Sequence, residues 1–356
     1  MKVLLTSHAY VVRENLKKAE LLAQMGVELT VLAPKRWRHE FGAFEAPHDV
    51  SGFRFITLDT AGTGDNDNFC YKEALPEEEF DIAHIEQEPW SFVTHHLILH
   101  LRAKKKIVFT WENIYRRRFL LGDMENAVLR HAAAIVAGND GAREVVEAKG
   151  FRGPVFILPQ FGVDTKLFKR VPAERTSKDF VVGYAGRLVE AKGIFELLRA
   201  AALLDAELVM IGSGNEEKAL VKLARKLRYE KLRLLGARPR GEMPLHYSGM
   251  DVFVLASKTT RKWKEQFGMA LAEAMACGVA VVGSNSGAIP YVVGDAGLIV
   301  PEGDAAALAD ALLRLKMDKT LRDQLAQKAR TRVLDHFSAE IVARRTLEIY
   351  ERVSRL

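Results

Sequence analysis

Residues 264–293, KEQFGMALAEAMACGVAVVGSNSGAIPYVV, place two glutamates eight positions apart, on either side of a glycine. The run MALAEAMA in this stretch is apolar except for Glu273, which predicts a mostly buried helix that begins near Gly268 and ends at residues 277–278. The apolar run AVVGS that follows predicts a strand. A helix that starts after a glycine offers free backbone N–H groups and the positive end of its dipole, which suits a phosphate or another anion.

The two glutamates have different expected surroundings. Glu265 lies in the polar loop that would approach such an anion. Glu273 lies about one and a half turns into the helix, where a carboxylate buried without a partner is costly. We therefore expect Glu273 to contact a hydroxyl group or a cation.

This stretch resembles the donor-site signature of the retaining glycosyltransferases of family 4, which have the GT-B fold of two Rossmann-like domains facing across a cleft. In that family the first glutamate contacts hydroxyls of the donor sugar, the amides after it contact the sugar and the diphosphate, and the second glutamate holds the nucleotide ribose. The resemblance assigns these roles to Glu265, to Gln266, Phe267 and Gly268, and to Glu273. Taken alone, two glutamates at this spacing are an ordinary surface feature, and it is the flanking sequence that favours the resemblance.

Short apolar runs alternate with helical stretches along most of the chain, which predicts α/β domains with parallel sheets covered by helices on both faces. The pattern lapses at residues 160–179 and resumes with FVVGYAG. We predict an N-terminal acceptor-binding domain at residues 1–165 and a C-terminal nucleotide-sugar domain at residues 166–335. The last segment, residues 336–356, resembles the family's final helix, which crosses back to the first domain.

Two further stretches resemble the family and bring cations to the donor site. FILPQFGVDTKLFKR resembles its linker, and VVGYAGRLVEAKGIFELLRA resembles its phosphate-binding turn, in which Arg187 and Lys192 are the cations for the diphosphate. From the residues alone, these cations flank a turn between a strand and a helix, where glycines permit close approach of a ligand. As isolated surface side chains they would be unremarkable.

Two weaker candidates for donor contacts lie further along this domain. Gly214 lies in GSGNEE, a glycine turn that is weak evidence for a site by itself. It becomes a candidate only because it follows the apolar run AELVMI. Arg238 lies in RPRGEMPLHYSGM, which resembles the segment whose backbone meets the nucleotide base.

The first half departs from the family pattern after its first strand. Members commonly carry a Gly-Gly loop there, whereas this chain has SHAYVVREN at residues 7–15, so His8 and Arg13 become candidates to replace the glycines. In family members a histidine often follows the threonine at the end of the fifth strand, and in this chain Trp111 and Glu112 occupy that place. The family's GGIPE becomes GAIPY at residues 287–291 and loses its acid.

His84 and Glu86, at the end of the run DIAHIE, complete the acceptor or cleft candidates. Loops at the carboxyl edge of a sheet often carry function, so an acceptor contact and a structural role are both open for this pair.

No metal site is predicted. Asp65-Asn66-Asp67 imitates a metal-binding Asp-x-Asp, but it lies in a turn-rich loop without a flanking apolar strand. His96 and His100 have the spacing of ligands on one helix, but no Glu or Cys completes a set, so ordinary helix histidines are the favoured interpretation.

Composition and charge bound the possible functions. The 356 residues are 48% hydrophobic and carry a net charge of +6. The whole excess of positive charge comes from the residues after 170, which include 29 basic and 23 acidic side chains. Seven basic residues in 102–118 and nine in 218–240 are either solvated faces or contacts for an anionic membrane. Nucleic-acid binding is not favoured, because no basic platform is interleaved with aromatic residues.

The start of the chain and its cysteines point to a cytoplasmic protein. The chain enters a strand at once instead of a signal peptide, and no apolar run approaches the roughly 18 residues of a membrane span. Cys70 and Cys277 are too few for a disulfide framework. We expect a cytoplasmic protein, with peripheral contact at the inner face of the membrane as an additional possibility.

The resemblance implies a retaining glycosyltransferase that uses a nucleoside diphosphate sugar, requires no divalent metal and no other cofactor, and transfers a hexose to a hydroxyl of a glycan or lipid-linked acceptor. The alternatives are a nucleotide-sugar epimerase on the same fold and a non-catalytic protein that binds a membrane surface.

Overall fold

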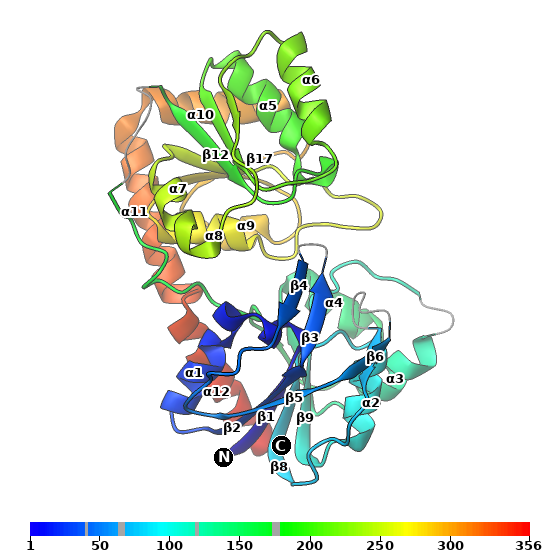
Figure 1. Ribbon diagram of the computed structural model, residues 1–356. Helices are drawn as coiled ribbons and strands as arrows, with labels where there is room; N and C mark the ends of the chain where they lie inside the picture. The colour runs from blue at the N-terminus through cyan, green and yellow to red at the C-terminus, as the bar shows by residue number, and fades with distance from the viewer. Residues whose placement is uncertain (40–41, 63–67, 118–120, 173–178) are drawn as a thin grey trace. The chain divides into compact units, whose positions relative to one another are not determined.

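The computed structural model describes residues 1–39, 42–62, 68–117, 121–172 and 179–356. It divides into two compact units, one of Met1–Gly162 with Ala339–Leu356 and the other of Val163–Ser338 (Figure 1). The first boundary, after Gly162, lies three residues before the one expected after residue 165. The second boundary, after Ser338, lies three residues beyond the one expected after residue 335.

The first unit is built on a seven-stranded parallel sheet in the order β11-β10-β9-β8-β1-β2-β5. Its strands read as nearly continuous apolar runs, because helices cover both faces of a parallel sheet. The strands are β1 (Lys2–Thr6), β2 (Glu28–Pro34), β5 (Arg54–Leu58), β8 (Phe80–Ile85), β9 (Ala103–Thr110), β10 (Ala134–Ala137) and β11 (Val155–Ile157).

Short antiparallel pairs and helices complete this unit. The pairs are β3 (Arg36–His39) with β4 (Gly42–Glu45), and β6 (Thr60–Gly62) with β7 (Phe69–Tyr71). The helices are the 3₁₀ turns η1 (His8–Val11) and η2 (Arg13–Leu16), and α1 (Lys17–Gln24), α2 (Phe92–His100), α3 (Gly122–His131), α4 (Asp140–Ala148) and α12 (Ala339–Ser354).

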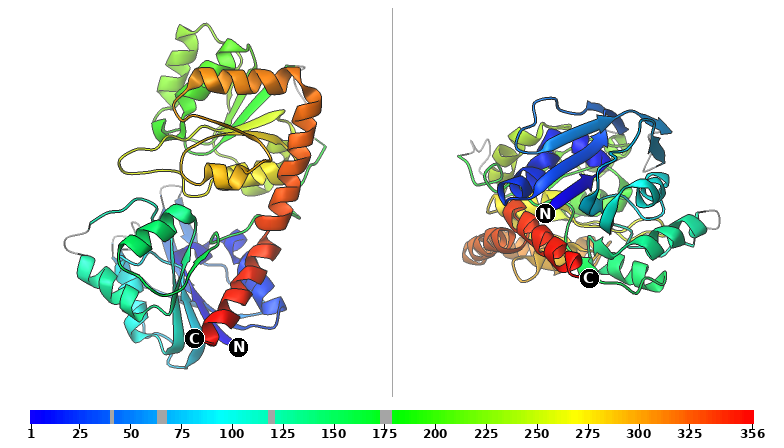
Figure 2. Two further views of the ribbon diagram at one scale, coloured as in Figure 1. Left: turned by 180° about the vertical axis from the view of Figure 1, so that it is seen from behind. Right: turned by 90° about the horizontal axis from the view of Figure 1, so that it is seen from below.

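The last helix, α12, belongs to the first unit although it comes from the end of the chain (Figure 2). It packs against α1, and its Tyr350 and Val353 share one apolar core with Leu5 of β1. Each fully buried side chain of this size contributes about 1.5–3 kcal/mol. The final helix expected at residues 336–356 therefore starts at Ala339 and helps to form the core of the first unit.

The second unit is built on a six-stranded parallel sheet in the order β14-β13-β12-β15-β16-β17. Its strands are β12 (Val181–Ala185), β13 (Glu207–Ile211), β14 (Leu232–Leu234), β15 (Val252–Leu255), β16 (Ala280–Ser284) and β17 (Leu298–Val300). Its helices are η3 (Glu190–Lys192), α5 (Ile194–Leu203), α6 (Glu217–Lys226), η4 (Arg240–Glu242), α7 (Met243–Ser248), α8 (Met269–Ala276), α9 (Ile289–Val293), α10 (Ala305–Met317) and α11 (Lys319–His336).

The order of strands in the second sheet reverses beside β12. Strands β13 and β14 lie on one side of β12, and β15, β16 and β17 lie on the other. Ligands of open parallel sheets bind at the carboxyl ends of the strands beside such a reversal. The loops after β12 and β15 are therefore the place to look for a site, and in the first sheet the loops after β1 and β8 have the equivalent position.

Residues 268–284 fold as predicted. Helix α8 is capped by Gly268 in the left-handed conformation, with φ of 87°, and ends at Cys277. Six of its eight residues are buried, and strand β16 follows it. Within the described residues, no helix is long and apolar enough to cross a membrane.

Candidate functional site

The turn after β12 is packed tightly against the loops around it. A Cβ atom on Gly193, whose φ is 67°, would lie 1.8 Å from the carbonyl oxygen of Ala256, in the loop after β15. A Cβ atom on Gly214 would lie 2.2 Å from the carbonyl oxygen of Leu188. Glycine is therefore required at both positions by the packing of the protein itself. Contact between Gly214 and a donor stays a prediction.

Lys192 and Glu265 meet at the reversal of the second sheet. Lys192 closes the turn after β12, and its Nζ lies 2.7 Å from Glu265 Oε2, in the loop after β15. Ser257 Oγ donates to the same carboxylate oxygen at 2.7 Å. The Lys192 and Glu265 side chains are only 14% and 7% exposed, so water screens this ion pair weakly. Arg187 lies half-buried in the same turn.

The backbone around Glu265 is fixed by the next loop. Ala288 N donates to the carbonyl oxygen of Glu265 at 3.1 Å, and a Cβ atom on Gly287 would lie 2.0 Å from that oxygen. Gly287 and Ala288 belong to GAIPY, the stretch that replaces the family's GGIPE. This stretch therefore still fixes the loop that carries Glu265.

The residues that follow Glu265 differ in what they offer to a ligand. Phe267 is buried, and its ring packs edge-to-face on Phe337 at 5.4 Å. Its side chain is structural, so only its backbone could meet a ligand. Gln266 and Gly268 are half-buried at the start of α8, where the first N–H groups of a helix lack partners within the helix. Their donor contacts stay predictions.

Glu273 has both kinds of partner that the sequence predicted. Tyr247 donates its hydroxyl to Oε2 at 3.1 Å, and an Arg240 guanidinium nitrogen lies 3.2 Å from Oε1. Burial raises the pKa of Glu273, and Arg240 and Tyr247 oppose that rise. All three residues belong to the second unit, so the carboxylate is held in place before any ligand arrives.

Arg240 contacts the candidate site at Glu273 but was not among the site residues predicted from the sequence. The predicted residue was Arg238, which is exposed, whereas Arg240 contacts Glu273 and lies over the ring of Phe168 at 5.4 Å. Both arginines lie in the segment RPRGEMP. The expected burial of Glu273 signalled that a cation is needed, but it did not indicate which arginine would supply it.

In the first unit, Glu86 is buried in a network of side chains from the same unit. Tyr10 donates to Glu86 Oε2 at 2.6 Å, and Lys18 forms an ion pair with Oε1. Lys18 also donates to the carbonyl oxygen of Gln160 at 2.7 Å. The Lys18 and Glu86 side chains are 3% and 1% exposed, so this pair is a structural anchor for α1 and the start of the linker.

His84 is equally enclosed. Its Nδ1 lies 2.9 Å from the hydroxyl of Tyr350 in α12, and burial lowers its pKa to about 4. An acceptor contact for His84 and Glu86 was one of the two open interpretations. The structure places both side chains inside the first unit, with 2% residual exposure each, which favours the structural role.

His8 and Arg13 lie near the end of β1 in the first sheet. The His8 ring stacks on Trp37 at 4.7 Å, and its Nδ1 lies 2.8 Å from Gln87 Oε1. Arg13 is exposed and lies 3.5 Å from Glu20 Oε1. The two side chains thus have partners in their own unit, and their contact with a diphosphate or an acceptor stays a prediction.

Trp111 and Glu112 follow β9 and are also held by neighbouring side chains. Trp111 Nε1 donates to Gln160 Oε1 at 3.2 Å. Glu112 forms an ion pair with Lys149, which also contacts Glu125 at 2.6 Å. Because the Glu112 side chain is only 8% exposed, its carboxylate serves this buried cluster and is poorly placed for an acceptor.

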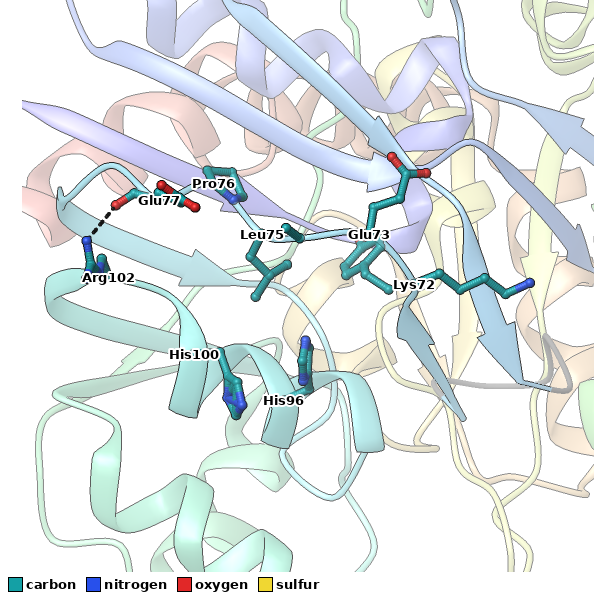
Figure 3. A pocket seen from close by; sticks show the side chains of 10 residues that line it. Lys72, Glu73, Leu75, Pro76, Glu77, His96, His100 and Arg102 are labelled. Atoms are coloured by element: carbon teal, nitrogen blue, oxygen red, sulfur yellow. Dashed lines mark hydrogen bonds between the residues drawn. The ribbon is translucent and has the colours of Figure 1, made fainter.

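The two metal-like patterns of the sequence have different outcomes. Residues 65–67 lie outside the described residues. His96 and His100 project from α2 beside a pocket under the segment of residues 71–77, with ring centroids 4.7 Å apart (Figure 3). In the described ranges, no group of three or more His, Cys, Asp or Glu residues is placed to hold a metal ion.

Two family models match consecutive parts of the chain. The model described as Glycosyltransferase Family 4 matches residues 16–167, and the model described as Glycosyl transferases group 1 matches residues 166–332. The chain belongs to the family 4 glycosyltransferases. The two matches meet within a few residues of the boundary between the two units.

Among the relatives of this family 4 member are several bacterial glycosyltransferases. The capsular polysaccharide biosynthesis glycosyltransferase CapM of Staphylococcus aureus is 29% identical over 58% of this chain and 56% of its own length. The phosphatidyl-myo-inositol mannosyltransferase of Mycolicibacterium smegmatis is 29% identical over 95% of this chain and 89% of its own. The chain spans about half the length of several of these relatives, CapM included.

Solved structures of GT-B proteins share the fold. The sucrose-phosphate synthase of Thermosynechococcus elongatus superposes with a TM-score of 0.75, at 21% identity and 99% coverage of both chains. HepE of Anabaena, in complex with UDP and glucose, gives 0.72 at 16% identity, with 99% of this chain and 100% of HepE covered. At such identities the likeness establishes the fold, which is the fold class expected from the sequence.

Proposed function

We propose that the protein is a retaining, metal-independent glycosyltransferase that moves a hexose-type sugar from a nucleoside diphosphate to a hydroxyl of a glycan or lipid-linked acceptor. The observation that carries this proposal is the meeting of Lys192 and Glu265, 2.7 Å apart, at the reversal of the second sheet. A cation for a diphosphate and a carboxylate for sugar hydroxyls are thereby side by side, where ligands of such sheets bind.

In the proposed reaction, the bond between the anomeric carbon and the diphosphate oxygen breaks as the acceptor oxygen bonds to that carbon. Arg187, Lys192 and the start of α8 would stabilise the negative charge of the leaving diphosphate. Glu265 would accept hydrogen bonds from the sugar hydroxyls and favour the positive charge that develops on the sugar. The proton of the acceptor hydroxyl would pass to the departing phosphate oxygen, and departure and attack on one face would retain the anomeric configuration.

The proposed acceptor class is supported by the names of the relatives, which include a capsular polysaccharide enzyme and a phosphatidyl-myo-inositol mannosyltransferase. A lipid-linked acceptor would bring the protein to a membrane surface. The basic residues of the stretch 218–240 would favour an anionic surface by about 1 kcal/mol for each residue near it.

The proposed function is tested by a thermal-shift screen of UDP, GDP and ADP sugars, followed by transfer assays with the donor that stabilises the protein. Acceptors would be offered both as soluble oligosaccharides and as glycolipids in vesicles. The anomeric configuration of the product, read by NMR, tests retention. A stabilising donor from which no sugar reaches any acceptor would count against transfer.

The two alternatives predict different results with the donor alone. A nucleotide-sugar epimerase needs no acceptor, so it would convert the donor into an isomer that chromatography detects. A non-catalytic membrane-binding protein would bind vesicles and turn over nothing. The presence of Arg187, Lys192, Glu265 and Glu273 in the places described above favours catalysis.

We predict that chelation leaves the activity unchanged. Arg187 and Lys192 would meet the charge of the diphosphate, so a divalent ion has no necessary role. The measurement is the initial rate of transfer with EDTA in excess over trace metals. Loss of turnover that magnesium or manganese restores would contradict the metal-free mechanism.

We predict that Glu273→Gln chiefly raises the KM for the donor, by about tenfold, while kcat stays within about twofold. A ribose contact is made equally in the ground and transition states, so its loss acts on binding. Steady-state kinetics with varied donor provide the measurement. Tyr247→Phe is the matched control, because it removes one hydrogen bond to Glu273 and keeps the carboxylate.

A further inference from the structure

The loop between β15 and α8 carries a tryptophan that covers the cation of the candidate site. The ring centroid of Trp263 lies 4.6 Å from Lys192 Nζ, and the same Nζ is 2.7 Å from Glu265 Oε2. The ammonium is thus held between an aromatic face and a carboxylate. The contact is within the range in which an aromatic ring attracts a cation.

The turn that presents Trp263 is closed by its own hydrogen bonds. Thr260 N donates to the carbonyl oxygen of Trp263 at 2.7 Å, and Trp263 N donates to Thr260 Oγ1 at 2.9 Å. Lys258 N donates to the carbonyl oxygen of Ala191 at 2.7 Å, which ties the loop to the residue before Lys192. The position of the ring over Lys192 therefore follows from the backbone of both loops.

This arrangement prepares Lys192 for an anion. A lysine side chain is flexible, and holding it in one orientation beforehand reduces what a ligand must immobilise. An ammonium has three N–H donors. One N–H of the Lys192 ammonium donates to Glu265, and the Trp263 ring covers another side of the ammonium. A further N–H can therefore donate to a phosphate oxygen while these two contacts persist.

We propose that Trp263 is a positioning residue that orients the Lys192 ammonium for the diphosphate of the donor. The inference rests on the proposed function, because that function supplies the diphosphate. Trp263 acts through Lys192 and touches no reacting atom. Its removal should therefore matter only when Lys192 is present.

The test is a double-mutant cycle on the binding of inorganic pyrophosphate, measured by calorimetry in metal-free buffer. Trp263→Leu should weaken binding about fivefold, the effect of a partly exposed cation–π contact. Trp263→Phe keeps an aromatic face and should stay within about twofold of the wild type. In the Lys192→Met background, Trp263→Leu should have no further effect. Arg261→Ala, which removes an exposed cation from the same turn, is the matched control and should leave binding unchanged.

Three results would overturn the inference: unchanged affinity in Trp263→Leu, equal weakening in both backgrounds, or no binding of pyrophosphate to the wild type. If circular dichroism shows that Trp263→Leu is unfolded, Trp263→Met provides the same comparison. Sugar transfer is assayed separately. Coupling in the cycle without transfer from any nucleotide sugar would contradict the proposed function alone, and transfer without coupling would contradict the inference alone.

Discussion

Glu265→Gln is expected to lower kcat for sugar transfer by about a hundredfold or more, the scale on which removing one group that stabilises developing charge acts. Glutamine has nearly the same shape and can still accept from Ser257, but it lacks the negative charge. Hydrogen bonds from the sugar to a carboxylate strengthen as positive charge develops at the anomeric carbon. Their loss should therefore appear in kcat, with a smaller effect on KM.

Two controls separate this effect from a general disturbance of the site. The substitution also removes the ion pair of Lys192, so the affinity for the sugar-free diphosphate is measured in parallel and should change much less than kcat. Ser257→Ala removes one hydrogen bond to Glu265 and keeps its charge, so its kcat should stay much closer to the wild type. If Glu265→Gln keeps kcat and raises only KM, or if Glu273→Gln is the slower enzyme at saturation, the proposed division of roles is wrong.

The sequence predicted α8 and its surroundings because local signals agreed there. An apolar run between two glycines predicts a buried helix, and the expected cost of burying Glu273 predicted a partner for it. The pattern could not tell which cation would reach that carboxylate. Arg238 and Arg240 lie two positions apart in a loop, and only the backbone path of η4 brings Arg240 to Glu273.

The candidates of the first unit show what sequence position alone could not reveal. His84 and Glu86 follow the pattern of residues at the carboxyl edge of a sheet, where function is common. Their burial depends on partners far away in the chain, since Tyr350 is 266 residues from His84 and Lys18 is 68 residues from Glu86. No local pattern predicts that the last helix of the chain covers the end of β8.

The network around Glu86 also has an energetic explanation. Burying an ammonium and a carboxylate costs several kcal/mol each, and the pair is tolerated only when hydrogen bonds satisfy both groups. Tyr10 and the carbonyl oxygen of Gln160 supply such bonds here. Because Gln160 starts the linker, the pair fixes where the chain leaves the first unit.

Replacing both Arg187 and Lys192 with alanine is expected to weaken binding of the free nucleoside diphosphate by about 3–6 kcal/mol, or more than a hundredfold. Each charge-assisted contact with phosphate contributes about 1.5–3 kcal/mol, and both cations lie in the one turn at the reversal of the second sheet. Calorimetry with the diphosphate that stabilises the protein most provides the measurement. Removing Lys192 also leaves the Glu265 carboxylate without its cation, which adds to the loss of affinity for the diphosphate.

The matched control for this double variant is Lys222→Ala with Arg225→Ala, two exposed cations of α6. It removes the same net charge, so it reproduces any change in the long-range attraction of the protein for an anion. That attraction falls with ionic strength, whereas direct contacts with phosphate at a partly buried turn are screened less. We therefore expect the control to lose little affinity, and to lose less still as salt is added. If the Arg187 and Lys192 variant binds the diphosphate as the wild type does, or if the control loses as much, the diphosphate does not bind at the turn after β12, and the assignment of the donor site to the second unit is wrong.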